Sequence, residues 1–242
     1  MAGMTPDEAQ YPPDAAAQRA KAAANRAMFD AIAHRYDTLN RLMSLGLDAR
    51  WRRKQAALCE LTPGMTALDL CCGTGDVART LTGCGATVTG LDASGKMLAV
   101  AGTRGGDIAY VQGDALRTPF PDGSFDAVTI AFGNRNVASL PALYAEMRRV
   151  AKTGGRVVSL EITGPTAPVL REAFFLYFTH VPPLLARLLG ADPGAYTYLP
   201  DSVRRYPAPA AVAAIMRDAG LREVTVHPLM LGAVVLHRGI AG

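Results

Sequence analysis

The sequence is poor in cysteine, and the cysteines are not spaced like a metal site. Four occur among the 242 residues, at positions 59, 71, 72 and 84, and no two of them form a Cys-x-x-Cys pair. Because neighbouring side chains on a strand point to opposite faces, Cys71 and Cys72 are poorly placed to share a zinc ion or a redox reaction. We therefore expect no metal site, and four small buried side chains in a reducing compartment.

The sequence also lacks a long uninterrupted hydrophobic segment. Its most apolar stretch, Ala173–Gly190, contains His180, Pro182, Pro183 and Arg187, and falls short of the roughly 20 apolar residues of a membrane-spanning helix. The first residues, MAGMTPDEAQYPPD, are acidic and lack the basic and apolar regions of a secretory signal. These absences predict a cytoplasmic protein and leave peripheral contact with the inner face of a membrane open.

Neither sign of charge dominates. Lys and Arg number 25 against 21 Asp and Glu, which gives a formal net charge of +4, and the basic residues are scattered apart from short clusters such as RWRRK at 50–54. A run that short usually forms a solvated helix face, so we expect no nucleic-acid partner. The same mild positive charge is compatible with an anionic membrane surface.

Half of the residues are hydrophobic, and the chain is long enough to bury one α/β core. Short β-rich segments alternate with helical patterns. This predicts a mostly parallel sheet covered on both faces, with a binding crevice at the carboxyl ends of the strands. The expected strands are Thr66–Cys72, Ala86–Asp92, Ile108–Asp114, Phe125–Phe132 and Arg156–Thr163, and the expected helices between them are Thr74–Gly85, Ser94–Gly102 and Pro141–Lys152.

Other segments decorate this sheet. Residues 1–60 are expected to form an N-terminal tail and helical cap, with helices near 15–33 and 49–61, ahead of a domain at 61–242. The alternation breaks at 164–207, where clustered aromatic residues indicate an inserted helical lid. After a helix at Pro209–Gly220, the segments Leu221–Pro228 and Leu231–Gly239 are linked too closely for a parallel crossover, and we expect an antiparallel hairpin.

The segment DLCCGTG, Asp69–Gly75, lies where the first strand turns into the first helix. Gly73 and Gly75 allow a tight turn whose backbone approaches a ligand closely. Asp92 ends the second strand 19 residues after Gly73, near the spacing at which an acidic side chain accepts hydrogen bonds from a ribose, and Asp114 ends the third strand. This pattern fits a dinucleotide or S-adenosylmethionine (SAM).

Two features of the loop favour SAM. Cys71 occupies the first glycine position of the Gly-x-Gly-x-x-Gly pattern, and the third glycine is missing. Asp76 begins the following helix, where it would repel a pyrophosphate but tolerates a sulfonium cation. An NAD-dependent oxidoreductase, a SAM-binding regulator without activity, and a plain sheet turn with chance acidic residues stay as alternatives.

Several motifs occur together in one order. They are FDAIAHRYDTLNRLMSLGLDARWRR, FGNRNV, RRVAKTGGRVVSLEIT, YTYLPDSVRRYP and GAVVLHRG. With them, the chain from Phe29 to Gly239 resembles the menaquinone and ubiquinone C-methyltransferases, the UbiE/MenG family. The resemblance implies a class I SAM-dependent methyltransferase with a Rossmann-like α/β fold. Cys71 and Cys72 depart from the Ala and Gly common there, so Cys72 fills a space beside the cofactor that the family leaves almost empty.

The resemblance also implies which residues bind SAM. The implied set is Asp69, Gly73, Thr74, Gly75, Asp92, Asp114 and Ala115. Within it, the glycine loop holds the methionine end, Asp92 takes the ribose hydroxyls, and Asp114 with Ala115 contacts the adenine.

The implied reaction is methylation of a ring carbon of a polyprenylated quinol. Carbon is a weak nucleophile until a neighbouring hydroxyl, with a pKa of about 10, loses its proton. Arg135 could favour that loss through its charge, Asn136 and Tyr36 could orient the hydroxyl or a water, and His34 is an alternative base. We favour a naphthoquinol acceptor; a benzoquinol of the ubiquinone pathway or another small molecule stays open.

The aromatic insertion has two compatible interpretations. Phe174, Phe175 and Phe178 have the spacing of a helix core, and an insertion after the fifth strand is also placed to supply an apolar groove for an isoprenoid tail. Contact with a membrane surface would serve the same substrate. The N-terminal helices are a candidate surface for a homodimer.

Overall fold

The computed structural model describes residue 11, residues 14–190 and residues 194–242. A seven-stranded sheet lies at the centre of this part, in the order β3-β2-β1-β4-β5-β7-β6. Its strands are β1 Thr66–Leu70, β2 Thr87–Asp92, β3 Ile108–Gln112, β4 Phe125–Ala131, β5 Ala151–Ile162, β6 Leu221–Leu229 and β7 Val234–Ala241. Residues 1–10 and 12–13, most of the segment searched for a secretory signal, lie outside the described residues.

The sheet is mostly parallel. β1 pairs in parallel with β2 and β4, β2 with β3, and β4 with β5, whereas β7 is antiparallel to both β5 and β6. The predicted α/β sheet with a C-terminal antiparallel hairpin is therefore confirmed. The direction in which strands are added reverses between β1 and β4, and the carboxyl ends of these two strands are where a binding crevice is expected.

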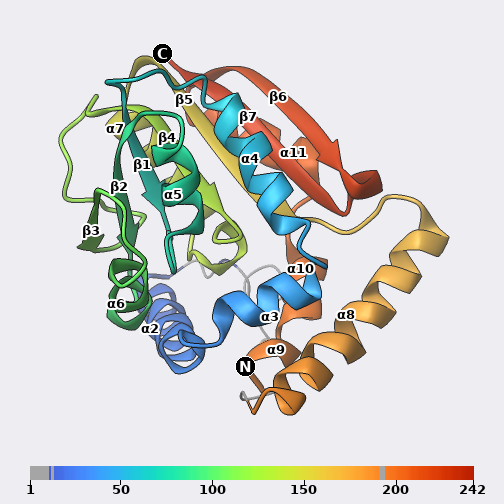
Figure 1. Cartoon of the computed structure of the whole chain (residues 1–242). Helices are drawn as coiled ribbons and strands as arrows, with labels where there is room; N and C mark the ends of the chain where they lie inside the picture. Colours follow the sequence, from blue (N-terminus) through green and yellow to red (C-terminus); the bar gives the residue numbers. More distant parts are fainter. Residues whose placement is uncertain (1–10, 12–13, 191–193) are drawn as a thin grey trace.

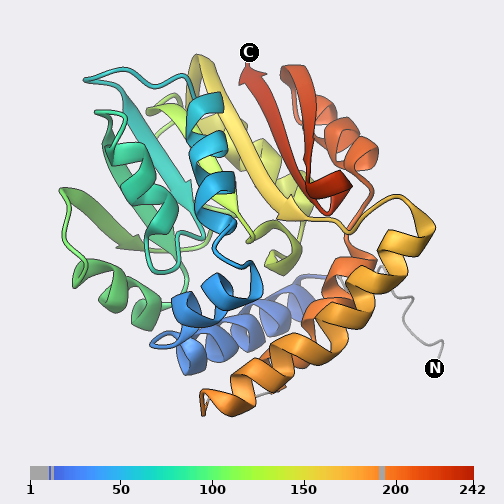
Figure 2. The same cartoon turned by 45° about the vertical axis from the view of Figure 1, so that its right-hand side comes forward.

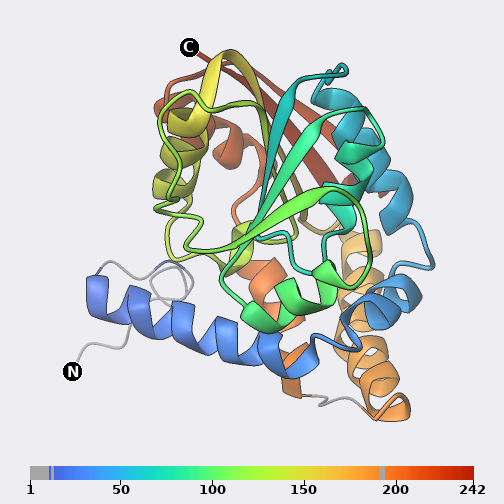
Figure 3. The same ribbon diagram turned by 60° about the vertical axis from the view of Figure 1, so that its left-hand side comes forward.

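Helices cover both faces of the sheet (Figure 3). Leu68 and Leu70 of β1 share a core cluster with side chains of α7 and α11, whereas Ala67 shares one with α4 and α5. Because side chains alternate along a strand, Asp69 lies on the same face as Ala67. The covering helices are α4 Asp48–Leu58, α5 Asp76–Thr82, α6 Gly95–Gly102, α7 Leu140–Val150 and α11 Pro209–Asp218.

The other helices form a cap at the carboxyl ends of the parallel strands (Figures 1 and 2). Two of them precede the sheet in sequence, and three come from the insertion between β5 and α11, which is helical as predicted. Ile32 and Leu39 share a core cluster with Tyr196 of the insertion, so the two segments pack together. The cap helices are α2 Ala15–Ile32, α3 Tyr36–Met43, α8 Pro168–Leu188, α9 Gly194–Thr197 and α10 Leu199–Arg205.

Some predicted boundaries were wrong, above all at β5. We expected this strand to begin at Arg156, but it begins at Ala151, because Ala151 pairs with Phe125 ahead of an irregularity in the ladder. Helix α7 accordingly ends at Val150, two residues before the predicted end at Lys152. The hairpin link is also longer than expected, since the 3-10 turn Met230–Gly232 separates β6 from β7.

Helix α8 continues through Pro182 and Pro183, which interrupt the apolar sequence but not the helix. A proline in a helix interior costs about 3 kcal/mol, and the burial of Phe175, Pro182 and Ala186 opposes that cost. Among the described residues, no helix is both long and apolar enough to cross a membrane.

The four cysteines are free thiols. Cys59 and Cys72 are buried as expected, but Cys71 and Cys84 are only half-buried, because one follows the end of β1 and the other lies in the turn after α5. Within the described part of the chain, no group of three or more His, Cys, Asp or Glu is arranged to hold a metal ion.

Candidate active site

The glycine loop between β1 and α5 has a backbone that few side chains allow. Gly73 and Gly75 have φ angles of 54° and 82°, and Cys71 has a φ of 50° in spite of its side chain. A Cβ atom added at Gly75 would lie 2.3 Å from the hydroxyl oxygen of Tyr110. Gly75 lines none of the cavities described below, so its contribution to the site is the turn itself.

Asp92 connects this loop to the end of β2. Its Oδ2 accepts the backbone N–H of Gly73 at 2.8 Å, and its Oδ1 accepts the backbone N–H of Ser94 at 2.8 Å. Burial raises the pKa of Asp92, although these backbone donors oppose the rise. The carboxylate is thus held in a fixed orientation at the carboxyl end of the sheet.

A cavity of about 300 Å³ lies between the ends of the strands and helix α2. Asp114 and Ala115 reach it from the segment after β3, where Asp114 also accepts the backbone N–H of Leu116 at 2.9 Å. We call this space the cofactor cavity. The predicted site residues that meet in it are Tyr36, Gly73, Asp92, Asp114, Ala115 and Asn136.

A smaller cavity of about 30 Å³, the loop cavity, is lined by Asp69 and Thr74. Asp69 is buried, and its Oδ1 accepts the hydroxyl of Thr129 at 2.8 Å, whereas its Oδ2 has no hydrogen-bond partner among the described residues. Burial raises the pKa of Asp69 to about 7. Since an unpaired buried carboxylate oxygen is costly, this atom is suited to receive a cationic group of a ligand.

A cavity of about 270 Å³, the apolar cavity, lies between the cap and the sheet. Phe174 and Phe178 line this cavity with their rings stacked 4.3 Å apart, whereas Phe175 is buried in a core cluster. The insertion therefore forms both a helix core and part of an apolar cavity, and the isoprenoid tail stays a prediction. The aromatic residues that line it are Phe29, Tyr36, Trp51, Phe132, Phe174, Tyr177, Phe178, Tyr196 and Tyr198.

Three residues line both large cavities, namely Phe29, Tyr36 and Phe132. Burial raises the pKa of Tyr36, although a hydrogen bond to the side chain of Asn40 opposes the rise. A molecule in the apolar cavity would therefore lie next to one in the cofactor cavity, with Tyr36 and Phe132 at the boundary.

Arg135 lines the apolar cavity as half of a buried ion pair. Its Nη1 pairs with Oε1 of Glu161, and its backbone N–H donates to Oε2 of Glu161 at 3.2 Å. Burial alone would lower the pKa of Arg135, but the carboxylate of Glu161 outweighs burial, and the pKa is raised. Glu161 therefore offsets much of the positive charge that the sequence led us to assign to catalysis.

Tyr198 is a candidate that we did not single out from the sequence. Burial raises the pKa of its hydroxyl, although the side chains of Arg135, which lines the apolar cavity, and Asn136, which lines the cofactor cavity, oppose the rise. The motif YTYLPDS contains it, but nothing in that motif distinguishes it from Tyr196. His34, the alternative base, is exposed and lines neither large cavity.

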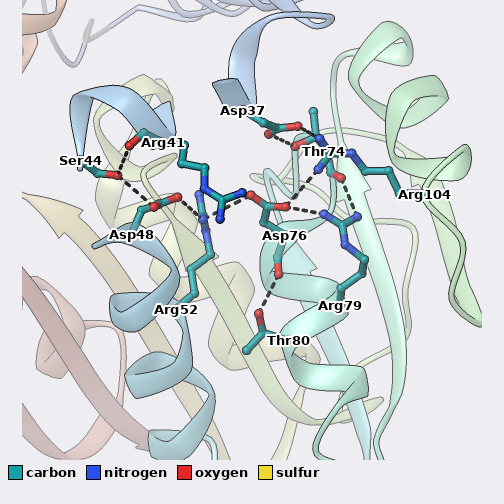
Figure 4. Close-up of polar contacts among 10 residues, drawn as sticks. All are labelled: Asp37, Arg41, Ser44, Asp48, Arg52, Thr74, Asp76, Arg79, Thr80 and Arg104. Carbon is teal, nitrogen blue, oxygen red and sulfur yellow. Dashed lines mark hydrogen bonds and ion pairs between the residues drawn. The ribbon is translucent and has the colours of Figure 1, made fainter. Parts of the chain in front are cut away.

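Ion pairs and hydrogen bonds connect helices α3 and α4 to the glycine loop and the start of α5 (Figure 4). Asp76, at the start of α5, pairs with Arg52 of α4 at 3.2 Å and with Arg104 at 3.1 Å. Arg104 also pairs with Asp37 of α3, which accepts the hydroxyl of Thr74 at 2.5 Å. These partners are far apart in sequence, and no spacing in the sequence indicated them.

Comparison with known proteins identifies the family. Residues 17–241 match the model of the ubiE/COQ5 methyltransferase family. The chain belongs to this family. It is therefore a methyltransferase, as the motifs predicted, and its methyl donor is SAM.

Its relatives are similar over nearly their whole length. A demethylmenaquinone methyltransferase from Roseiflexus castenholzii is 44% identical over 220 residues, which cover 88% of this chain and 91% of the relative. Proteins of the same name from Thermus thermophilus and Deinococcus radiodurans are 44% and 45% identical. These matches cover 88% and 84% of this chain, and 99% and 86% of the relatives.

Solved structures share the fold at low identity. A SAM-dependent methyltransferase from Thermotoga maritima has a TM-score of 0.61 at 19% identity, covering 89% of this chain and all, 100%, of the other. One from Aquifex aeolicus has a TM-score of 0.59 at 17% identity, covering 85% and 98%. The predicted class I methyltransferase fold is confirmed.

Proposed function

We propose that this methyltransferase transfers the methyl group of SAM to a ring carbon of a polyprenylated naphthoquinol, demethylmenaquinol. The observation that carries the proposal is the pair of cavities that share Tyr36 and Phe132 as a wall, one with acidic groups at strand ends and the other apolar and aromatic. The names of the relatives support this acceptor.

The groups that line the cofactor and loop cavities fit SAM. Asp92 and Asp114 offer carboxylates for the ribose hydroxyls and the adenine amine. Gly73 and Thr74 are proposed to hold the methionine end, beside the unpaired oxygen of Asp69. When bound, the sulfonium supplies an electrophilic methyl group and leaves as a neutral thioether.

The residues of the apolar cavity are proposed to help a ring hydroxyl lose its proton. We assign Arg135 and Tyr198 to hold the ring oxygen, with Glu161 keeping Arg135 charged and oriented and Asn136 holding Tyr198. Hydrogen-bond donors fixed in a dry cavity stabilise an oxyanion more than water does. The ionised oxygen pushes electron density to the ring carbon, which bonds to the methyl group and then loses its own proton to restore the aromatic ring.

Exposed apolar side chains lie at one edge of the apolar cavity. Leu45 and Met230 line it and are 82% and 52% exposed, and Leu231, next in the chain, is 76% exposed. An isoprenoid tail leaving the cavity past these residues would stay in apolar surroundings. We propose that this rim contacts the membrane surface from which the acceptor comes.

The proposed acceptor is tested by comparing two acceptors under one set of conditions. Methyl transfer from radiolabelled SAM is measured with reduced naphthoquinol and reduced benzoquinol that carry the same short prenyl tail. We expect kcat/KM to be at least about 10-fold higher for the naphthoquinol, since a fused ring adds apolar area to bury. The reverse preference would contradict the naphthoquinol assignment, and transfer to neither, despite saturable binding of SAM, would contradict quinol methylation altogether.

A further inference from the structure

Arg52 stands where the glycine loop meets the apolar cavity. Its side chain is 10% exposed, and its Nη1 pairs with Asp48 at 2.5 Å and with Asp76 at 3.2 Å. The guanidinium carbon lies 5.9 Å from the ring centroid of Phe132. Arg52 lines both the apolar cavity and the loop cavity, so it borders the spaces proposed for the acceptor and for the cofactor.

The ion pairs of Arg52 leave part of its guanidinium unused. Both pairs involve Nη1, and within the described residues neither Nη2 nor Nε donates to another group. A guanidinium carries five N–H donors in a planar fork that matches the two oxygens of a carboxylate. Arg52 can therefore keep its contacts with the protein and still bind an anion.

The loop cavity offers charges of both signs. Arg52 is the only Lys or Arg among the described residues that line it, and Asp69 contributes the carboxylate oxygen without a partner. Gly73 and Thr74 line the same cavity. An amino acid carries a carboxylate and an ammonium on one carbon. Of the two aspartates that line the cavity, Asp76 pairs with Arg52, whereas Asp69 keeps an oxygen without a partner among the described residues, so Arg52 and Asp69 together complement both groups.

We propose that Arg52 binds the carboxylate of the methionine portion of SAM, and that Asp69 receives the ammonium group. The proposal rests on the proposed position of the methionine end at the glycine loop. Arg52 also pairs with Asp76 and lies over the ring of Phe132, which lines both the cofactor cavity and the apolar cavity. Binding of the cofactor to Arg52 would therefore stabilise the position of Phe132 between the two cavities. Arg52 is then a cofactor-binding residue supplied by α4, a helix on one face of the sheet, rather than by the ends of the strands.

Two other arginines pair with the same aspartate but lie outside the cavities. Arg79 and Arg104 both contact Asp76, their side chains are 27% and 31% exposed, and neither lines the cofactor, loop or apolar cavity. Arg79 also donates from Nη1 to the backbone carbonyl of Thr74 at 3.0 Å. It is therefore a control for Arg52 that shares Asp76 and a contact with the glycine loop (Figure 4), but lines none of the three cavities.

The test changes the residue and the ligand together. The dissociation constants of SAM and of decarboxylated SAM, which lacks only the carboxylate, are measured by calorimetry for the full chain and for Arg52→Gln and Arg79→Gln. In the unaltered protein we expect loss of the carboxylate to weaken binding about 10- to 100-fold, as for a hydrogen-bonded charge pair. Arg52→Gln should weaken the binding of SAM by a similar factor and change the dissociation constant of decarboxylated SAM by less than about threefold. The preference of the protein for SAM over decarboxylated SAM should therefore disappear. Arg79→Gln should retain it.

Unchanged binding of decarboxylated SAM would also show that Arg52→Gln is folded. If that variant does not fold, Arg52→Lys replaces it, and we expect the preference to fall to a few-fold, because an ammonium lacks the planar fork. The assignment of Arg52 would be overturned if Arg52→Gln or Arg52→Lys kept the full preference for SAM, or if the unaltered protein bound both ligands equally. SAM binding and the proposed function would stand in either case. Failure of the unaltered protein to bind SAM would overturn both.

Discussion

Arg135 lines the apolar cavity and its charge is paired with Glu161, so removal of its side chain should lower stability as well as turnover. Its partner Glu161 is buried, and breaking one half of a buried ion pair typically costs about 3–5 kcal/mol, because the other charge is left uncompensated. A loss of activity in Arg135→Ala alone would therefore combine an effect on catalysis with an effect on stability.

A double variant separates these two effects. We expect Arg135→Ala to lower the free energy of unfolding by about 3–5 kcal/mol and turnover by about 100-fold or more, with nearly unchanged affinity for SAM. Arg135→Met combined with Glu161→Leu should regain most of the stability and none of the turnover. Urea denaturation and steady-state kinetics measure both quantities. Turnover that returns with stability would mean that Arg135 has no part in the chemistry.

Asp69 should make stability depend on pH in an unusual direction. Burial raises its pKa from 3.8 to about 7. The unfolded chain loses this proton near pH 4 and the native protein only near pH 7, so between these values the native state binds more protons and stability falls as pH rises. We compare the free energy of unfolding of the unaltered protein with that of Asp69→Asn. The difference should shift in favour of the unaltered protein by up to about 4 kcal/mol as the pH is lowered from about 7 to about 4.

Denaturation of both proteins over this pH range, without ligand, provides the measurement. A difference between them that does not vary with pH would show that Asp69 is already ionised in the native protein. The proposed ammonium partner favours the ionised form, so binding of SAM should tighten as pH rises through about 7.

At the scale of elements, the insertion supplies two tyrosines to the apolar cavity in different roles. The side chains of Arg135 and Asn136 act on the pKa of the Tyr198 hydroxyl, whereas the hydroxyl of Tyr196 has no hydrogen-bond partner among the described residues. We expect Tyr198→Phe to lower kcat about 10-fold or more with little change in SAM affinity. Tyr196→Phe, its matched control, should leave kcat within about twofold. Equal effects in the two variants would argue against a role for the Tyr198 hydroxyl.

The elements that the sequence predicted well are those defined by local patterns. The alternation of strands and helices, the glycine loop and the acidic residues at strand ends are local, and Asp92 and Asp114 do share a cavity with Gly73. The early start of β5 could not be predicted, because it depends on pairing between Ala151 and Phe125.

The contacts that complete the site were beyond prediction for the same reason. Arg135 and Glu161 are 26 residues apart and come from different elements, and Arg52 meets Asp76 only because α4 packs beside α5. The family motifs contained Arg52 and Glu161 without indicating their partners. Pairing of charges depends on the arrangement of helices in space, which no spacing within one motif specifies.

At the scale of the molecule, the site forms where the cap meets the sheet. Helices that precede the sheet and helices of the insertion after β5 cover the strand ends, and the exposed side chains of Leu45, Met230 and Leu231 form an apolar rim beside them. The expected homodimer and the expected lack of a nucleic-acid partner stay predictions.

The rim is tested by adding charge to it. Leu231→Glu should reduce binding to anionic vesicles several-fold, because a carboxylate is repelled by the surface and costly to bury in it. It should leave the turnover of a short-tail acceptor in solution nearly unchanged. Val226→Glu places the same charge at an exposed position on β6, outside the rim, and should change neither quantity. A vesicle affinity that falls equally in both variants would assign the effect to net charge.

Methyl transfer to reduced and to oxidised naphthoquinone tests the central claim most directly. The protein is incubated with SAM labelled in its methyl group and either form of a short-tail acceptor, and the position of the label is determined by mass spectrometry and NMR. We expect one label per acceptor, on a ring carbon and with the reduced form alone, because only a ring hydroxyl can lose the proton that activates that carbon. A label on oxygen, or equal transfer to the oxidised form, would contradict it.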